Sequence, residues 1–213
     1  MKNRITRSGV AEILTAVFVT ATILANVLAG RVWVLYGDWT LSGGVFIFPI
    51  SLVVGDILSE IYGWKKTKKV IMIGFLMSAV AVGIYNIINV LPAPVWFEEG
   101  ANAYKSVLGT TWRALLGGLT AFVIGHLVNS KILVKMKERG GNEFWFRAMV
   151  STVFGELVDS VIFVFIMFSF VMPINVLLMM ILLQVVTKSL VEALVLPITN
   201  RIVNVLKEIP EVV

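Results

Sequence analysis

Cysteine is absent from the 213 residues, and histidine occurs only once. The chain therefore has no disulfide, no thiolate metal ligand and no cysteine nucleophile, and it lacks the clustered histidines of a typical zinc site. Charged residues are scarce at 15% of the chain, whereas a soluble domain has about a quarter. Motifs of zinc proteases, serine hydrolases, kinases and phosphate-binding loops do not occur either. We therefore expect no bound metal and no cofactor.

Hydrophobic residues, in contrast, make up 58% of the sequence. They are gathered in blocks of about twenty, the length a helix needs to cross roughly 30 Å of hydrocarbon. Each block is expected to be a helix, because backbone groups in hydrocarbon must bond within their own segment. The pattern predicts an all-α polytopic membrane protein, formed by a single transmembrane domain over residues 1–213. Six transmembrane helices are predicted, at about 9–29, 45–64, 69–90, 108–133, 147–171 and 176–201.

Lysine and arginine predict the orientation of these helices. With the N-terminus inside, only Arg31, Lys105 and Arg113 fall on the outer side. The inner side receives Lys2, Arg4, Arg7, Lys65, Lys66, Lys68, Lys69, Lys131, Lys135, Lys137, Arg139, Arg147, Arg201 and Lys207. This bias places both termini in the cytoplasm. The alternative for the first block is a cleaved signal peptide. Because the basic residues flank apolar blocks, we expect anionic membrane lipids and not nucleic acid as their partner.

Acidic and basic side chains also occur inside the apolar blocks. The motif GDILSE (55–60) puts Asp56 and Glu60 on one helix face, and GELVDS (155–160) does the same for Glu156 and Asp159. Along the sixth block, Gln184, Lys188 and Glu192 follow one face at intervals of four. Ionisable groups at such depth normally face a bundle interior or a wet cavity and mark a transport pathway. We predict that they meet around one cavity near the middle of the membrane.

Two structural explanations stay open beside this prediction. Glu60 and Glu192 lie near enough to the cytoplasmic ends of their helices for the side chains to reach the interface. Asp159 and Lys188 could also form an ion pair whose role is purely structural. A pair explains only two of the charges, and the remaining surplus is acidic. The surplus favours a cavity that receives hydrogen-bond donors from a ligand.

The two acidic motifs resemble each other. VGDILSEIYG (54–63) aligns with FGELVDSVIF (154–163) at an offset of one hundred residues, and the two helices would run in opposite directions. Such a match predicts a three-plus-three inverted repeat with a shared site between its halves.

Packing signals come from proline and small residues. Pro49 predicts a bend in the second span. Gly117, Ala121 and Gly125, four apart in the fourth span, allow a second helix to approach closely. That helix belongs either to the same chain or to a second copy in a homodimer.

Four segments carry a resemblance to a known family, the queuosine precursor transporters, also called the YhhQ or vitamin uptake transporter (VUT) family. The segments are FPISLVVGDILSEIYG (48–63), LPAPVWF (91–97), STVFGELVDSVIF (151–163) and LLQVVTKSLVEAL (182–194). The similarity runs in order from about residue 10 to 205. It implies a six-helix inner-membrane importer of 7-deazaguanines (preQ0, preQ1 or queuine), which feed queuosine modification of tRNA.

The resemblance also implies roles for individual residues. The acid pattern of the family maps onto Asp56, Glu60 and Asp159, and its lysine maps onto Lys188. Glu156 stands where many relatives carry glutamine, and this departure favours a more basic or donor-rich ligand. Asp56 or Glu60 is a candidate for loading and releasing a proton during transport, and facilitated diffusion is the alternative.

The physical chemistry of a guanine-like ligand fits these residues. Its ring N–H and exocyclic amine can both donate to one carboxylate, and such charge-assisted hydrogen bonds are strong. Its flat ring needs aromatic faces, for which three phenylalanines are the nearest candidates. The predicted substrate-binding residues are Asn26, Phe48, Asp56, Glu60, Phe154, Glu156, Asp159, Phe163, Gln184 and Lys188.

Two other functions remain as alternatives. A substrate-binding subunit that needs a separate energising complex has similar features, and uptake by the purified protein in liposomes would separate it from a self-sufficient importer. A membrane-embedded enzyme could also use buried acids, but the chain has no recognisable nucleophile or metal motif. We expect a transporter and not an enzyme.

Overall fold

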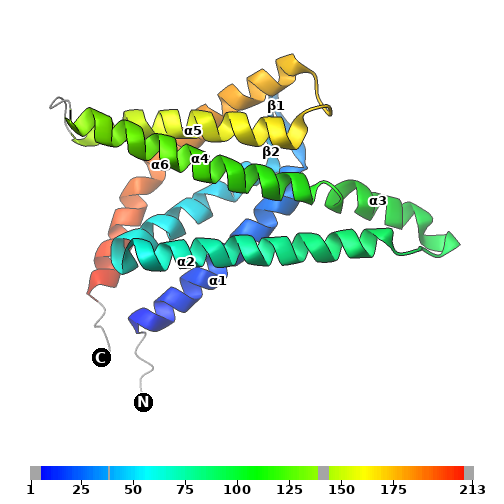
Figure 1. Cartoon of the computed structure of the whole chain (residues 1–213), viewed down its shortest axis with the longest axis horizontal. Helices are drawn as coiled ribbons and strands as arrows, with labels where there is room; N and C mark the ends of the chain where they lie inside the picture. Colours follow the sequence, from blue (N-terminus) through cyan, green and yellow to red (C-terminus); the bar gives the residue numbers. More distant parts are fainter. Residues whose placement is uncertain (1–5, 38, 139–143, 209–213) are drawn as a thin grey trace.

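The computed structural model describes residues 6–37, 39–138 and 144–208. Lys2, Arg4 and Arg139, which contributed to the predicted orientation, lie outside these ranges. Figure 1 shows a mostly helical molecule with one small β-hairpin. The elements are α1 (Arg7–Ala29), β1 (Val32–Tyr36), β2 (Trp39–Ser42), the 3₁₀ helix η1 (Gly43–Phe46), α2 (Phe48–Val90), the 3₁₀ helix η2 (Val95–Phe97), α3 (Glu98–Leu108), α4 (Thr111–Glu138), α5 (Phe144–Phe168) and α6 (Ile174–Lys207).

Within the described residues, five helical stretches are long and apolar enough to cross a membrane. They are Arg7–Ala29, Phe48–Val90, Val95–Asn129, Met149–Phe168 and Ile174–Lys207. The protein is therefore a multi-pass membrane protein by length and composition. The number is five because α2 contains both the second and the third predicted span.

A sharp bend divides α2 at Gly63. This residue has φ 73° and ψ 170°, which is not a helical conformation. A positive φ costs glycine little because it has no Cβ. Figure 1 shows the two parts of α2 meeting at an angle, so that the chain changes direction there. The lysine-rich turn predicted between the two spans is instead part of the helix that follows the bend.

The all-α prediction is wrong between the first and second helices, where β1 and β2 form an antiparallel hairpin. Val32 pairs with Ser42, and Trp33 pairs with Leu41. The hydroxyl of Ser42 donates to the carbonyl of Ala29 at 2.9 Å, which ties the end of β2 to the end of α1. Strands of four and five residues are too short for an alternating pattern to stand out in an apolar sequence.

The bend predicted at Pro49 is also wrong. The helix α2 begins at Phe48, so Pro49 lies in its first turn. A helix start needs no N–H donor at that position, and the fixed φ of proline suits it. Pro49 therefore starts the helix, and the bend lies further along at Gly63.

The tightest helix contact joins α4 to α5 through glycine. A Cβ atom on Gly125 would lie 3.0 Å from the Cβ of Asp159 and 3.0 Å from the carbonyl oxygen of Gly155. A Cβ on Gly117 would lie 3.3 Å from Cγ2 of Ile166. The predicted stripe of small residues thus serves packing within the chain, and a homodimer stays a prediction.

We expect Gly125→Ala to lower the free energy of unfolding by about 1–3 kcal/mol, the usual cost of adding a methyl group to a filled contact. Its neighbours here are backbone and Cβ atoms of α5, which cannot rotate away. Gly118→Ala is the matched control, since nothing lies within 4 Å of its Cβ position. Thermal unfolding in detergent should show a lower Tm for the first variant alone; equal Tm values would contradict the packing account.

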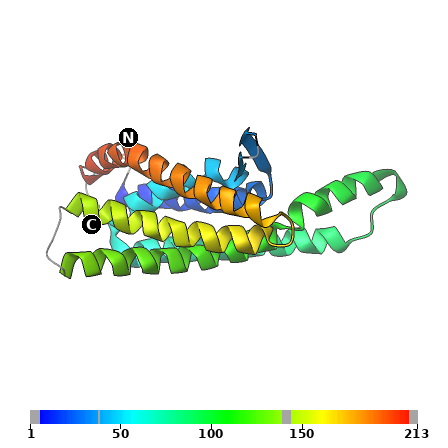
Figure 2. The same cartoon turned by 90° about the horizontal axis from the view of Figure 1, so that it is seen from above.

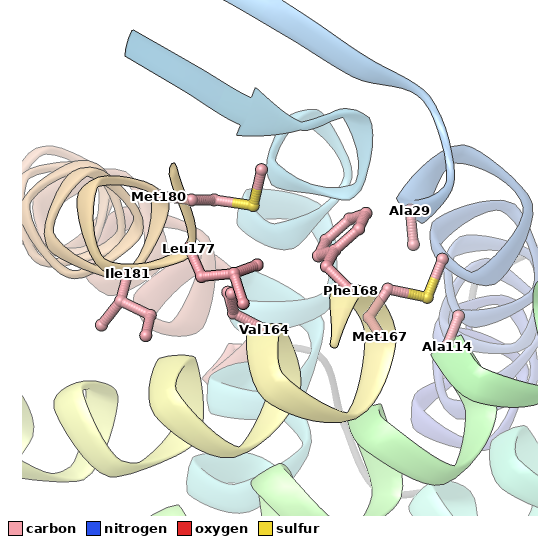
Figure 3. Close-up of a cluster of buried hydrophobic side chains, with 8 residues drawn as sticks. All are labelled: Ala29, Ala114, Val164, Met167, Phe168, Leu177, Met180 and Ile181. Carbon is pink, nitrogen blue, oxygen red and sulfur yellow. The ribbon is translucent and has the colours of Figure 1, made fainter. Parts of the chain in front are cut away.

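A cluster of buried apolar side chains holds four helices together near the β-hairpin. Figure 3 shows side chains of α1, α4, α5 and α6 converging on one another. The cluster consists of Ala29, Ala114, Val164, Met167, Phe168, Leu177, Met180 and Ile181. This packing fixes the start of α6 against the end of α5.

The two ends of the molecule differ in what they carry. In Figures 1 and 2, α3 and the end of α2 project beyond the other helices at one end, and the β-hairpin lies nearer to the middle of the molecule. The opposite end holds the start of α1, the bend of α2 and the end of α6.

Candidate functional site

Lys188 is the centre of a buried group of charges. It lies midway along α6 and is only 9% exposed. Its Nζ atom forms an ion pair with Oδ2 of Asp159 and lies 3.1 Å from Oε2 of Glu156. The Nζ atom also lies 5.0 Å from the centroid of the Phe48 ring, a cation–π contact at the start of α2. Three helices, α2, α5 and α6, thus contribute to one charged group.

Helical periodicity explains how two acids reach one lysine. Glu156 and Asp159 are three residues apart on α5, so their side chains lie on the same face one turn apart. The neighbouring Gly155 and Gly125 bring α5 close to α4 and leave the acidic face turned toward α6. Two carboxylates share one ammonium, so this group carries a negative surplus when all three are charged.

Two further acids lie in the same region without a basic partner. Among the described residues, no lysine or arginine pairs with Asp56 of α2 or Glu192 of α6. The hydroxyl of Thr152 donates to Oε1 of Glu192 at 3.4 Å. Glu192 lies close enough to Glu156 and Asp56 for their negative charges to repel one another. These acids are accepting groups that can receive donors from a ligand.

Two amide side chains, Gln184 and Asn26, have a buried nitrogen donor with no hydrogen-bond partner among the described residues. Gln184 is 3% exposed, and its Nε2 atom has no hydrogen-bond partner within the described residues. The Nδ2 atom of Asn26 on α1 is likewise buried and unpartnered in the same ranges. Buried polar groups in native proteins nearly always have a partner. Gln184 precedes Lys188 by one turn on α6, so its donor lies on the charged face.

Not every predicted residue belongs to this group. Glu60 lies at the end of the molecule near the termini, where its Oε1 atom is 2.5 Å from Nζ of Lys207. Phe154 is 49% exposed and, with Val150 and Val153, lines a hollow on the outer surface of α5. Phe163 is partly buried and packs against the apolar cluster of Figure 3. Glu60 and Phe154 therefore lie apart from the Lys188 group in this structure, and their part in ligand binding stays a prediction.

Comparison with known proteins adds to this geometry. Residues 42–202 match a family described as "Putative vitamin uptake transporter". The chain belongs to this vitamin uptake transporter family. It is also 25% identical to a protein of Bacillus subtilis (strain 168) named "Probable queuosine precursor transporter", over 73% of this chain and 68% of that protein. No solved structure matches.

The family match covers the helices that carry the buried charges. The matched range contains α2, α5 and most of α6, which carry Asp56, Asp159 and Lys188. The family name indicates a transporter rather than an enzyme. The part of the chain that the structure describes holds no group of three histidine, cysteine or acidic residues arranged for a metal ion. The Lys188 group offers hydrogen-bond acceptors on its acids and a hydrogen-bond donor on Gln184.

Two residues near the charged group were missing from the predicted ligand-binding set. Glu192 lies on the face of Gln184 and Lys188, but the sequence equally allows its side chain to reach the membrane interface. Thr152 lies one turn before Glu156 on α5, at a spacing of four. This spacing is the one sequence feature that places Thr152 on the acidic face, because a single hydroxyl in an apolar helix does not by itself indicate a binding site.

Proposed function

We propose that this member of the vitamin uptake transporter family imports queuosine precursors, the 7-deazaguanines, across the inner membrane. The observation that carries the proposal is the buried lysine shared by two acids, beside two acids that have no cation partner among the described residues. A membrane protein keeps such charges where they handle a polar substrate. The name of the Bacillus subtilis relative supplies the chemical class.

The proposed binding mode depends on which acids already form an ion pair with Lys188 and which do not. Lys188 holds Asp159 and Glu156, so these acids form a fixed wall of the site. Asp56 has no basic partner among the described residues and accepts both the ring N–H and the exocyclic amine of the deazaguanine. The free amide donor of Gln184 is directed to an acceptor on the ring.

The charge surplus bears on which deazaguanine is preferred. Glu156 shares the single positive charge of Lys188, which lies 3.1 Å away, with Asp159. Further negative charge is on Asp56 and Glu192, which lie near each other on α2 and α6. A ligand with an additional amine, such as preQ1, can donate to this second acid. We therefore propose tighter binding of preQ1 than of preQ0.

The proposed topology has six crossings with both termini in the cytoplasm. The bend at Gly63 supports two crossings within α2, since the helix changes direction there. The inverted repeat remains part of the proposal, on the match between the acid-bearing segments of α2 and α5. It would place the ligand between the two halves.

Proton coupling is proposed through Asp56. Glu60, the other candidate, lies in an exposed pair with Lys207. Asp56 lies nearer to the charged group. No cation within the described residues pairs with it and favours its deprotonated form. We expect an inward pH gradient to accelerate uptake into proteoliposomes, and Asp56→Asn to abolish that acceleration. Equal uptake with and without the gradient would remove proton coupling and leave facilitated diffusion.

A binding measurement tests the proposed substrate class. Purified wild type and Asp159→Asn are titrated with preQ0, preQ1, queuine and guanine, and the shift in Tm is recorded. We expect shifts for the deazaguanines with wild type and smaller shifts with Asp159→Asn, because Lys188 loses one of its two acids. Equal shifts for all ligands and both proteins would defeat the assignment.

A further inference from the structure

A second polar group joins three helices at the end of the molecule that carries both termini. Lys207 of α6 pairs with Glu60 of α2, with Nζ and Oε1 2.5 Å apart. A guanidinium nitrogen of Arg7 donates to the carbonyl oxygen of Lys207 at 3.0 Å. The hydroxyl of Tyr62 donates to the carbonyl oxygen of Arg7 at 2.7 Å. We call these four residues the terminal clasp; they connect the start of α1, the bend of α2 and the end of α6 (Figure 1).

The terminal clasp lies in line with the charged group. On α2, Asp56 precedes Glu60 by one turn. On α6, Glu192 follows Lys188 by one turn in the direction of Lys207. The two helices pack against each other. Asp56 and Glu192, which have no cation partner among the described residues, therefore lie between the proposed ligand site and the Glu60–Lys207 pair.

Each of these two helices has a weak point beside the terminal clasp. Gly63, directly after Tyr62, has φ 73°, and nothing lies within 4 Å of its Cβ position. Pro197 lies inside α6 between Glu192 and Lys207. It has no N–H group, so one hydrogen bond of the helix is missing there, and such sites allow bending. The end of α6 that carries Lys207 can therefore swing at Pro197 without disturbing the Lys188 group, whereas Glu60 and Tyr62 precede Gly63 and stay with Asp56.

The Glu60–Lys207 pair itself is suited to opening. Its side chains are 57% and 50% exposed. Exposed ion pairs contribute little to stability because water screens them, in contrast to the buried pairs of Lys188. A contact of this kind can break and re-form during each transport cycle.

We propose that the ligand leaves toward the cytoplasm between α2 and α6, past Asp56 and Glu192, and that the terminal clasp closes this exit. The inference rests on the proposed import function. It assigns a role to Glu60, Tyr62, Lys207 and Arg7 that ligand binding does not require.

Crosslinking tests the exit because the natural chain has no cysteine. Glu60→Cys and Lys207→Cys are introduced together and joined with a reducible bifunctional thiol reagent, whose spacer replaces the length lost from both side chains. Uptake of preQ0 into proteoliposomes and binding of preQ0 are measured before crosslinking, after it, and after reduction. The two single-cysteine variants, treated in the same way, are the controls.

We expect crosslinking to reduce uptake by about tenfold or more while binding persists, and reduction to restore uptake, because a closed exit blocks release and not recognition. Uptake that is unchanged in the crosslinked protein would overturn the exit, as would a failure of the two cysteines to crosslink. Wild type that neither binds nor transports preQ0 would instead overturn the import function, and the exit with it.

A charge swap keeps the test decisive if the double cysteine variant does not fold. Glu60→Lys places two lysines together and should hold the terminal clasp open, which lowers uptake. Adding Lys207→Glu restores an opposite pair and should restore at least half of the uptake. A swap that behaves like the single variant would contradict a role for this pair.

Discussion

Replacing Lys188 by methionine is expected to lower the free energy of unfolding by about 3–5 kcal/mol, the usual cost of removing one partner from a buried ion pair. Asp159 and Glu156 would then lie on one helix face without a cation, in a largely buried region. Methionine fills a similar volume, so a cavity adds little to the loss. Chemical or thermal unfolding in detergent measures the change.

Lys207→Met is the matched control for stability. It also removes a lysine paired with a carboxylate, but that pair is half exposed. Exposed pairs contribute about 0–1 kcal/mol, so the Tm should hardly change. Equal losses in the two variants would mean that burial of Lys188 has no energetic consequence. A rescue test completes the series: Lys188→Met combined with Asp159→Asn and Glu156→Gln should recover part of the lost stability.

Asp56→Asn is expected to weaken deazaguanine binding by about a hundredfold or more, because two charge-assisted hydrogen bonds contribute about 1.5–3 kcal/mol each. An amide at this position keeps one acceptor and presents donors to the donors of the ligand. Unlike Lys188→Met, this variant should keep or slightly raise the Tm. An unpaired carboxylate costs more to bury than a neutral amide, and Asp56 has no basic partner within the described residues.

Equilibrium binding of preQ0 and preQ1 measures this effect. Glu12→Gln is the control, since Glu12 is an exposed acid on α1. A ligand control separates recognition from general electrostatics: a 7-deazapurine without the exocyclic amine should bind wild type far more weakly, and should hardly distinguish wild type from Asp56→Asn. If both proteins bind preQ0 equally, Asp56 is not the acceptor.

The contacts around Lys188 could be predicted because they depend on short-range spacing. Glu156 and Asp159 are three apart on one helix, and a charge inside an apolar helix must turn toward a partner. The same rule places Phe154 off the acidic face of α5. It lies two positions from Glu156, about 200° around the helix, and so faces the other side. Proximity in the sequence alone does not place an aromatic residue on the face of the acids.

Other features depend on contacts that spacing cannot reveal. The partner of Glu60 is Lys207, 147 residues away. The position of Glu60 near a helix end allows exposure at the interface, but nothing in the sequence near Glu60 identifies Lys207 as its partner. The β-hairpin was missed because β1 and β2 are short and stabilised by tertiary contacts, such as the bond between Ser42 and Ala29. The bend at Gly63 needed a backbone conformation that glycine permits but does not require.

The most direct test of the account is uptake of labelled preQ1 by the purified wild-type protein alone in proteoliposomes, compared with Asp56→Asn. The account predicts saturable uptake by wild type, inhibited by unlabelled preQ0, and none above empty liposomes for the variant. Equal uptake by both proteins would contradict a ligand site formed by α2, α5 and α6. Binding without uptake by wild type would identify a subunit that depends on a separate energising complex.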